Sequence, residues 1–86
     1  MIREMLNTAV ALGHSLRADY ESFNDYSGYD VQDCINALNA CDEMELRIVD
    51  RDGEVIGWAL YIPELEADEQ IADCSGWCAE WLEDSE

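Results

Sequence analysis

The strongest structural signal in this chain is a pair of alternating segments on either side of an Asp-Gly turn. A period of two is typical of a half-buried β-strand, and Asp52 and Gly53 readily adopt the positive φ that a tight hairpin needs. Pro63 would stop the second strand. The alternating apolar residues are Met44, Leu46 and Ile48 before the turn, and Val55, Ile56, Trp58, Leu60 and Ile62 after it. The sequence therefore predicts an antiparallel β-hairpin.

Two helices are predicted before this hairpin. Residues 2–22 place their apolar side chains close to a helical period, which predicts a first amphipathic helix. Residues 23–29 (FNDYSGY) have no periodicity and contain Asn, Asp, Ser and Gly, so we expect a loop there. Asp30 can cap a short second helix. Its inner side would carry Val31, Cys34, Ile35, Leu38 and Cys41.

A third helix is predicted within residues 67–82, after the hairpin. Its apolar side would carry Ile71, Cys74, Cys78, Trp81 and Leu82. The chain shows no internal repeat and no linker, and 86 residues suffice for one domain but not for two. We therefore expect a small single α+β domain over residues 1–86, in the order α-α-β-β-α, with the antiparallel hairpin packed against helices on one face.

Charge is the most informative part of the composition. The chain has 21 Asp and Glu residues, four Arg, no Lys and one His, which gives a formal net charge of −17 at pH 7. Direct binding to DNA, RNA or phospholipid is disfavoured because proteins bind phosphates with Lys and Arg. The N-terminal residues lack the pattern of a secretory signal, and no apolar run approaches the roughly 20 residues that span a bilayer. We expect a cytoplasmic protein with reduced thiols.

The candidate site lies in the C-terminal third, where nine acidic residues and no basic residue fall between Glu64 and Glu86. On the predicted third helix, most of these carboxylates would face away from the apolar side. Trp77 lies at the border of the two faces, where an aromatic ring could anchor a partner or a homodimer. The predicted partner-binding residues are Glu64, Glu66, Asp68, Glu69, Asp73, Trp77, Glu80, Glu83 and Asp84.

The residues that most enzyme classes require are missing from the sequence. There is one His, and there is no G-x-S-x-G, P-loop or H-E-x-x-H motif, so we expect no enzyme and no catalytic residue. The spacing of the four cysteines favours core packing over a zinc site. Residues 50–54 (DRDGE) fit a hairpin turn better than a calcium loop. No metal and no cofactor are therefore expected.

A rigid scaffold with carboxylates several Å apart can satisfy the rows of Lys and Arg with which a protein binds duplex DNA. In size, acidity, absence of Lys and α+β layout, the whole chain resembles the DNA-mimic inhibitors of phages and mobile elements, namely anti-CRISPR and antirestriction proteins. That resemblance implies a partner that is a CRISPR effector complex or a restriction enzyme. It also implies occlusion of the surface where target nucleic acid would dock.

Other functions remain open at this stage. An acidic adaptor, immunity protein or antidote that neutralises a basic protein would have the same charge. The acidic face could be solvated surface only, or an adaptation to a salt-rich cytosol. If the predicted helical face binds nothing, we expect the site near residues 23–29 or residues 42–54.

Overall fold

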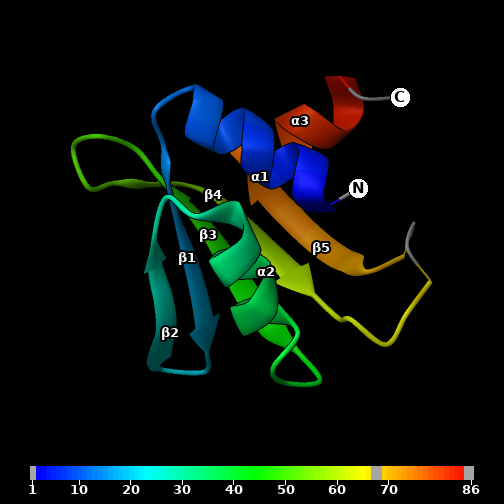
Figure 1. Ribbon diagram of the computed structural model, residues 1–86. Coiled ribbons are helices and arrows are strands. Elements are labelled where there is room, and N and C mark those ends of the chain that lie inside the picture. The colour runs from blue at the N-terminus through cyan, green and yellow to red at the C-terminus, as the bar shows by residue number, and fades with distance from the viewer. Residues whose placement is uncertain (1, 67–68, 85–86) are drawn as a thin grey trace.

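The computed structural model describes residues 2–66 and 69–84, and it confirms a small α+β domain (Figure 1). The five predicted elements occur in the predicted order, but the described residues form three further strands. The elements are α1 (Ile2–Ala11), β1 (Ser15–Tyr20), β2 (Phe23–Gly28), α2 (Val31–Leu38), β3 (Met44–Val49), β4 (Val55–Tyr61), β5 (Ile71–Gly76) and α3 (Trp77–Asp84). All neighbouring strands are antiparallel, in the sheet order β2-β1-β3-β4-β5.

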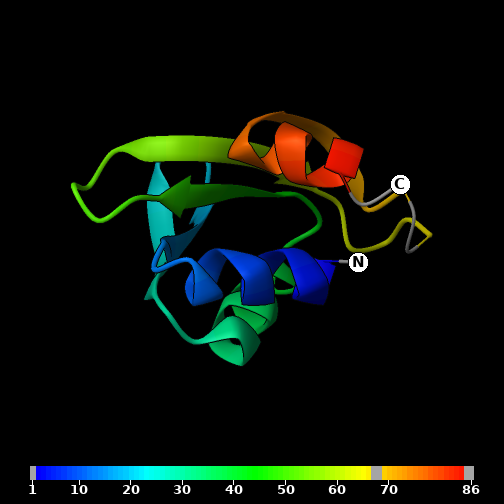
Figure 2. The same ribbon diagram turned by 90° about the horizontal axis from the view of Figure 1, so that it is seen from above.

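The core lies between one face of the sheet and the helices. In Figure 2, α1 and α2 lie together on one side of the sheet. Alternate side chains of the central strands point toward them, because successive residues of a strand face opposite sides. Cys34 and Leu38 of α2 are among the buried residues. The largest fully buried side chains are Met5, Leu6, Leu16, Leu38, Met44, Leu46, Ile48, Cys34 and Cys78.

The predicted hairpin is confirmed as β3 and β4. Gly53 has a φ of 85° in the turn. The Asp50 carboxylate accepts hydrogen bonds from the backbone N–H groups of Asp52 and Glu54, each at 2.9 Å. Strand β4 ends at Tyr61, shortly before Pro63. The turn therefore forms where the sequence places it.

The prediction of one helix over residues 2–22 is wrong, because α1 ends at Ala11 and a strand follows. Gly13 has a φ of 88° and stops the helix. Its N–H donates to the carbonyl of Val10 (2.9 Å), while the N–H of His14 donates to the carbonyl of Ala9 (3.0 Å). This is the Schellman arrangement, in which a left-handed residue satisfies the last helical carbonyls.

The prediction of a loop at residues 23–29 is also wrong. Strand β2 occupies most of this segment and pairs with β1, from Leu16 opposite Gly28 to Tyr20 opposite Phe23. It forms an edge of the sheet and most of its residues are exposed, so it lacks the apolar alternation of an inner strand. The predicted cap of α2 is confirmed, because Asp30 Oδ1 accepts from the N–H of Asp33 at 2.9 Å.

The predicted helix over 67–82 is wrong in its first half. Residues 71–76 form β5, which pairs with the edge of β4 that does not pair with β3. Helix α3 begins only at Trp77. Ala67 and Asp68 lie outside the described residues. Helix α3 packs over Gly57 on the core face, where an added Cβ would lie 3.0–3.1 Å from atoms of Cys78 and Trp77. Across the described residues, no helix is long and apolar enough to cross a membrane.

Candidate partner-binding site

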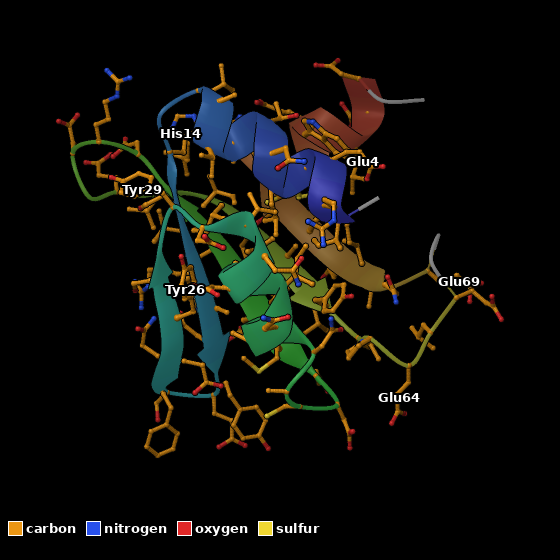
Figure 3. The ribbon with its side chains drawn as sticks, in the orientation of Figure 1. Glu4, His14, Tyr26, Tyr29, Glu64 and Glu69 are labelled. Carbon is orange, nitrogen blue, oxygen red and sulfur yellow. The ribbon has the colours of Figure 1, made fainter. Side chains whose placement is uncertain are left out.

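The structure spreads the predicted acidic residues over three places instead of one helical face. Glu64, Glu66 and Glu69 are exposed in the connection between β4 and β5, and Figure 3 shows Glu64 and Glu69 pointing away from the domain. Asp73 is exposed on the edge strand β5. The three predicted carboxylates on α3 are exposed: Glu80, Glu83 and Asp84. Asp68 lies outside the described residues.

Trp77, the expected aromatic anchor, is half-buried. Its ring lies edge-on to the ring of His14, with the centroids 6.0 Å apart and the planes at 79°. Its Cβ lies close to Gly57 in β4. Trp77 therefore joins α3 to the sheet and to the end of α1, and little of it is left for a partner.

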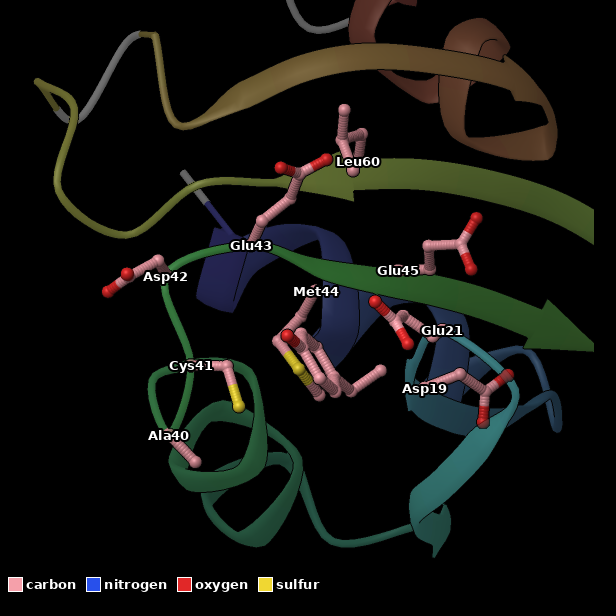
Figure 4. Close-up of a pocket in the computed structure, with 10 residues that line it drawn as sticks. Asp19, Glu21, Ala40, Cys41, Asp42, Glu43, Met44, Glu45 and Leu60 are labelled. Carbon is pink, nitrogen blue, oxygen red and sulfur yellow. The ribbon is translucent and has the colours of Figure 1, made fainter.

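A groove of about 640 Å³ lies elsewhere, at the end of the sheet where the β1–β2 hairpin approaches the connection between α2 and β3 (Figure 4). We call it the acidic groove. Its lining residues are Asp19, Tyr20, Glu21, Ala40, Cys41, Asp42, Glu43, Met44, Glu45 and Leu60. Half of these are carboxylates and none is basic. The acidic groove includes the start of one segment that the sequence left as an alternative site, residues 42–54, but no residue of the other, residues 23–29, lines it.

Two of the groove carboxylates are neutralised by arginines. Asp19 is only 4% exposed, and its Oδ2 lies 2.6 Å from Nη1 of Arg47 and 3.2 Å from Nη2 of Arg17. Its Oδ1 accepts from the amide of Asn24 at 2.7 Å. Glu45 accepts from Nη2 of Arg47 at 3.3 Å through one oxygen. The inner wall of the groove is therefore electrically balanced.

The outer carboxylates of the acidic groove are not neutralised. In the described part of the chain, no basic side chain comes within 4 Å of Glu21, Asp42 or Glu43. All three residues are exposed. In Figure 4, Glu21 extends from the hairpin tip, and Asp42 and Glu43 come from the connection after α2. These three carboxylates are available to a guanidinium or ammonium group of a partner.

Two exposed aromatic residues lie at the tip of the β1–β2 hairpin, and one of them, Tyr20, also lines the groove. Tyr20 and Phe23 pair across the tip and are 40% and 67% exposed. Glu21, between them, has a φ of 54°, a conformation that usually takes Gly or Asn. Apolar rings beside unpaired carboxylates are the combination with which proteins anchor other proteins. This tip was not predicted from the sequence, because the periodicity of residues 2–22 predicted one continuous helix.

Three of the four cysteines are unsuited to chemistry at neutral pH. Burial raises the pKa of the Cys34 and Cys78 thiols to about 12. Burial also raises the pKa of Cys74, and the nearby charges of Asp73 and Glu83 add to the shift. These thiols stay protonated, and the thiolate is the nucleophilic and metal-binding form. Among the described residues, no three His, Cys, Asp or Glu side chains are placed to hold a metal ion.

Comparison with known proteins identifies no relative. No family model, no curated protein and no solved structure matches this chain. A function must therefore be inferred from the site alone. The acidic groove offers negative charge for basic groups and aromatic rings for apolar contact, which suits recognition of another protein.

Proposed function

We propose that this chain is an acidic decoy: it binds the basic surface with which another protein holds nucleic acid, and it keeps the nucleic acid away. The observation that carries the proposal is the unpaired state of Glu21, Asp42 and Glu43 beside two exposed aromatic rings. The exposed carboxylates between Glu64 and Asp84 extend the negative surface.

The few cations of the chain are mostly engaged within the domain. Arg17 and Arg47 pair with Asp19, and Arg3 donates to the side chain of Gln32 at 2.6 Å. A basic partner therefore meets a surface with little positive charge to repel it. Carboxylates held on a rigid fold can occupy Lys and Arg groups that otherwise bind phosphates, and the net charge of −17 speeds encounter at low salt.

The proposed target is a CRISPR effector complex or a restriction enzyme. Such proteins hold nucleic acid in a positively charged channel. An acidic domain seated there would exclude the nucleic acid by occupying the same groups. No catalysis is needed for this inhibition.

A second candidate function is favoured by the aromatic hairpin tip. Tyr20 and Phe23 have no counterpart in a phosphate backbone, and exposed rings at the centre of a contact typically carry much of the binding energy between proteins. An antidote, immunity protein or adaptor for a basic protein would use the same groove and tip. In that case the partner's nucleic-acid affinity need not change.

The two candidates are separated by a competition experiment. A purified RNA-guided CRISPR effector complex and a purified restriction enzyme are each titrated with labelled target duplex, with and without this protein. A decoy weakens duplex binding at least tenfold and the effect fades at high salt. The protein alone should not shift the duplex. Stable binding to either enzyme with unchanged duplex affinity would exclude the decoy and leave the antidote or adaptor.

A further inference from the structure

The face of the sheet opposite the helices is not covered by any helix among the described residues. We call it the open face and define it by Arg17, Asp19, Glu45, Arg47, Trp58 and Leu60, which alternate with the core residues of β1, β3 and β4. Trp58 and Leu60 are half-buried there, and the indole N–H of Trp58 donates to Glu45 at 3.2 Å.

The strand register arranges the open face in two parallel rows. In one row Arg17 lies opposite Arg47, and Arg47 lies opposite Trp58. In the other, Asp19 lies opposite Glu45, and Glu45 lies opposite Leu60. Residues two apart along a strand are separated by about 7 Å, so the rows run side by side across the strands. One row is basic and aromatic, and the other is acidic and aliphatic.

The open face has little net charge. Its two arginines and two carboxylates have a formal sum of zero, and Asp73 of β5, opposite Leu60, adds one negative charge beside it, whereas the whole chain has a net charge of −17. Two of the four arginines of the chain lie here, on adjacent strands. Two copies of such an acidic protein repel each other over most of their surface. The open face is where that repulsion is locally smallest.

We propose that two copies of this chain form a dimer through their open faces. The two copies are related by a two-fold axis that lies in the plane of the contact. The axis runs perpendicular to the strands, between the two rows. It therefore places the basic row of one copy over the acidic row of the other. Arg47 then lies over Glu45 of the second copy, and Trp58 lies over Leu60. Arg17 lies over Asp19, whose carboxylate is buried and paired within its own copy. Each pair occurs twice, which is the self-complementarity that an isologous interface requires.

The size of the face sets the strength of this dimer. The same face of the whole sheet, with β2 and β5 included at its edges, has five strands about 4.8 Å apart and about six residues long, which make an area of about 24 by 20 Å, or roughly 480 Å². Stable protein interfaces bury about 800 Å² on each partner. We therefore expect a weak dimer that forms at high concentration and dissociates on dilution.

Sedimentation equilibrium from about 10 µM to about 1 mM protein in moderate salt tests the proposal. The wild type should shift from monomer to dimer over this range. Arg47→Glu should raise the dimer dissociation constant at least tenfold, because both rows become acidic at the contact. Arg3→Glu changes the net charge equally but lies on α1, so it should leave dimerisation nearly unchanged. A wild type that stays monomeric throughout would overturn the proposal.

The register itself is tested by mixing two variants. Arg47→Glu alone and Glu45→Arg alone each place like charges opposite each other and should remain monomeric. An equimolar mixture should form a heterodimer, because each contact then joins Arg to Glu. A mixture that stays monomeric would contradict the proposed axis. Because Arg47 pairs with buried Asp19, circular dichroism checks the fold of each variant.

An independent measurement does not depend on those variants. Concentration-dependent amide chemical shifts of the wild type should concentrate in β1, β3 and β4 at the open-face positions. Shifts confined to α1 or α3 would contradict the proposal. Asp19, Glu45 and Leu60 of the open face also line the acidic groove, so the dimer and a basic partner would compete for them. Neither experiment includes a basic partner, so failure of the dimer leaves the proposed function untouched.

Discussion

The backbone of Gly76 lies directly against the carbonyl oxygen of Ile56 in the neighbouring strand. A Cβ at this position would overlap that oxygen and come within 3.4 Å of the Cα of Gly57. Gly76 also has a φ of 61°, in the left-handed region. It ends β5 and lets the chain turn at once into α3, so the packing of the last helix on the sheet depends on the missing side chain.

We predict that Gly76→Ala lowers the free energy of unfolding by at least about 3 kcal/mol, from backbone strain and steric overlap together. Gly53→Ala is the matched control. Gly53 has a φ of 85°, but nothing lies within 4 Å of its absent Cβ, so we expect a loss of only about 1 to 2 kcal/mol. Urea unfolding measures both values. Equal losses would show that the contact with Ile56 is unimportant.

Charge reversal in the acidic groove should abolish partner binding. Glu21→Lys, Asp42→Lys and Glu43→Lys together replace three attractions by repulsions, and we expect affinity to fall about 100-fold or more. All three side chains are exposed, so the melting temperature should change little. Affinity at two salt concentrations and thermal melting measure the outcome.

The control for that triple variant changes the same amount of charge at the site that the sequence predicted. Glu80→Lys, Glu83→Lys and Asp84→Lys on α3 should weaken binding only a few-fold, through slower encounter. A larger loss from these α3 reversals than from the groove reversals would locate the partner on the C-terminal surface.

The aromatic tip should contribute to affinity without contributing to stability. Phe23→Ala removes a ring that is 67% exposed, so we expect less than about 0.5 kcal/mol of destabilisation but at least tenfold weaker partner binding. Leu12→Ala serves as control, because Leu12 is 55% exposed and follows α1. Calorimetric titration of each variant with the partner would measure the difference. Equal partner affinities of the Phe23→Ala and Leu12→Ala variants would show that the hairpin tip is not part of the binding site.

The buried thiols predict both a labelling order and an alkaline loss of stability. Iodoacetamide at pH 8 should modify half-exposed Cys41 first, and should modify Cys34 and Cys78 only after unfolding. Burial raises the pKa of both buried thiols from 9.0 to about 12. Their contribution to stability is therefore complete below pH 9 and is lost between pH 9 and 12, where only the unfolded chain releases the protons.

Mass spectrometry follows the labelling, and thermal melting between pH 7 and 11 follows the stability. Burial of Tyr61 raises the pKa of its hydroxyl and adds to the same alkaline decline. Rapid labelling of Cys34 in the folded protein would show that α2 opens away from the sheet. A melting temperature that stays constant up to pH 11 would contradict the predicted decline.

The elements that the sequence predicted well depend on local chemistry. The Asp52-Gly53 turn and the Asp30 cap each act within a few residues, so their residue types alone indicate them. Strands β2 and β5 were missed because they lie at the edges of the sheet, where pairing with an inner strand decides the conformation. Gly13 was the available signal that the first helix ends early.

The candidate site was harder to predict than the fold. Counting acidic residues along the sequence favoured the C-terminal third, but it could not show which carboxylates the arginines neutralise. Asp19 and Arg47 are 28 residues apart in the chain and meet only because β1 pairs with β3. The groove likewise joins Glu21 and Asp42 from segments that are distant in sequence. Such a site becomes visible only when the strand order is known.

The left-handed backbone of Glu21 implies a compromise between the stability of the fold and partner binding. Gly or Asn would adopt a φ of 54° with less strain, so either should make the hairpin tip more stable by about 1 kcal/mol. Each replacement would also remove a carboxylate from the rim of the groove. Variants selected only for thermal stability should therefore tend to replace Glu21, and they should then bind a basic partner with lower affinity.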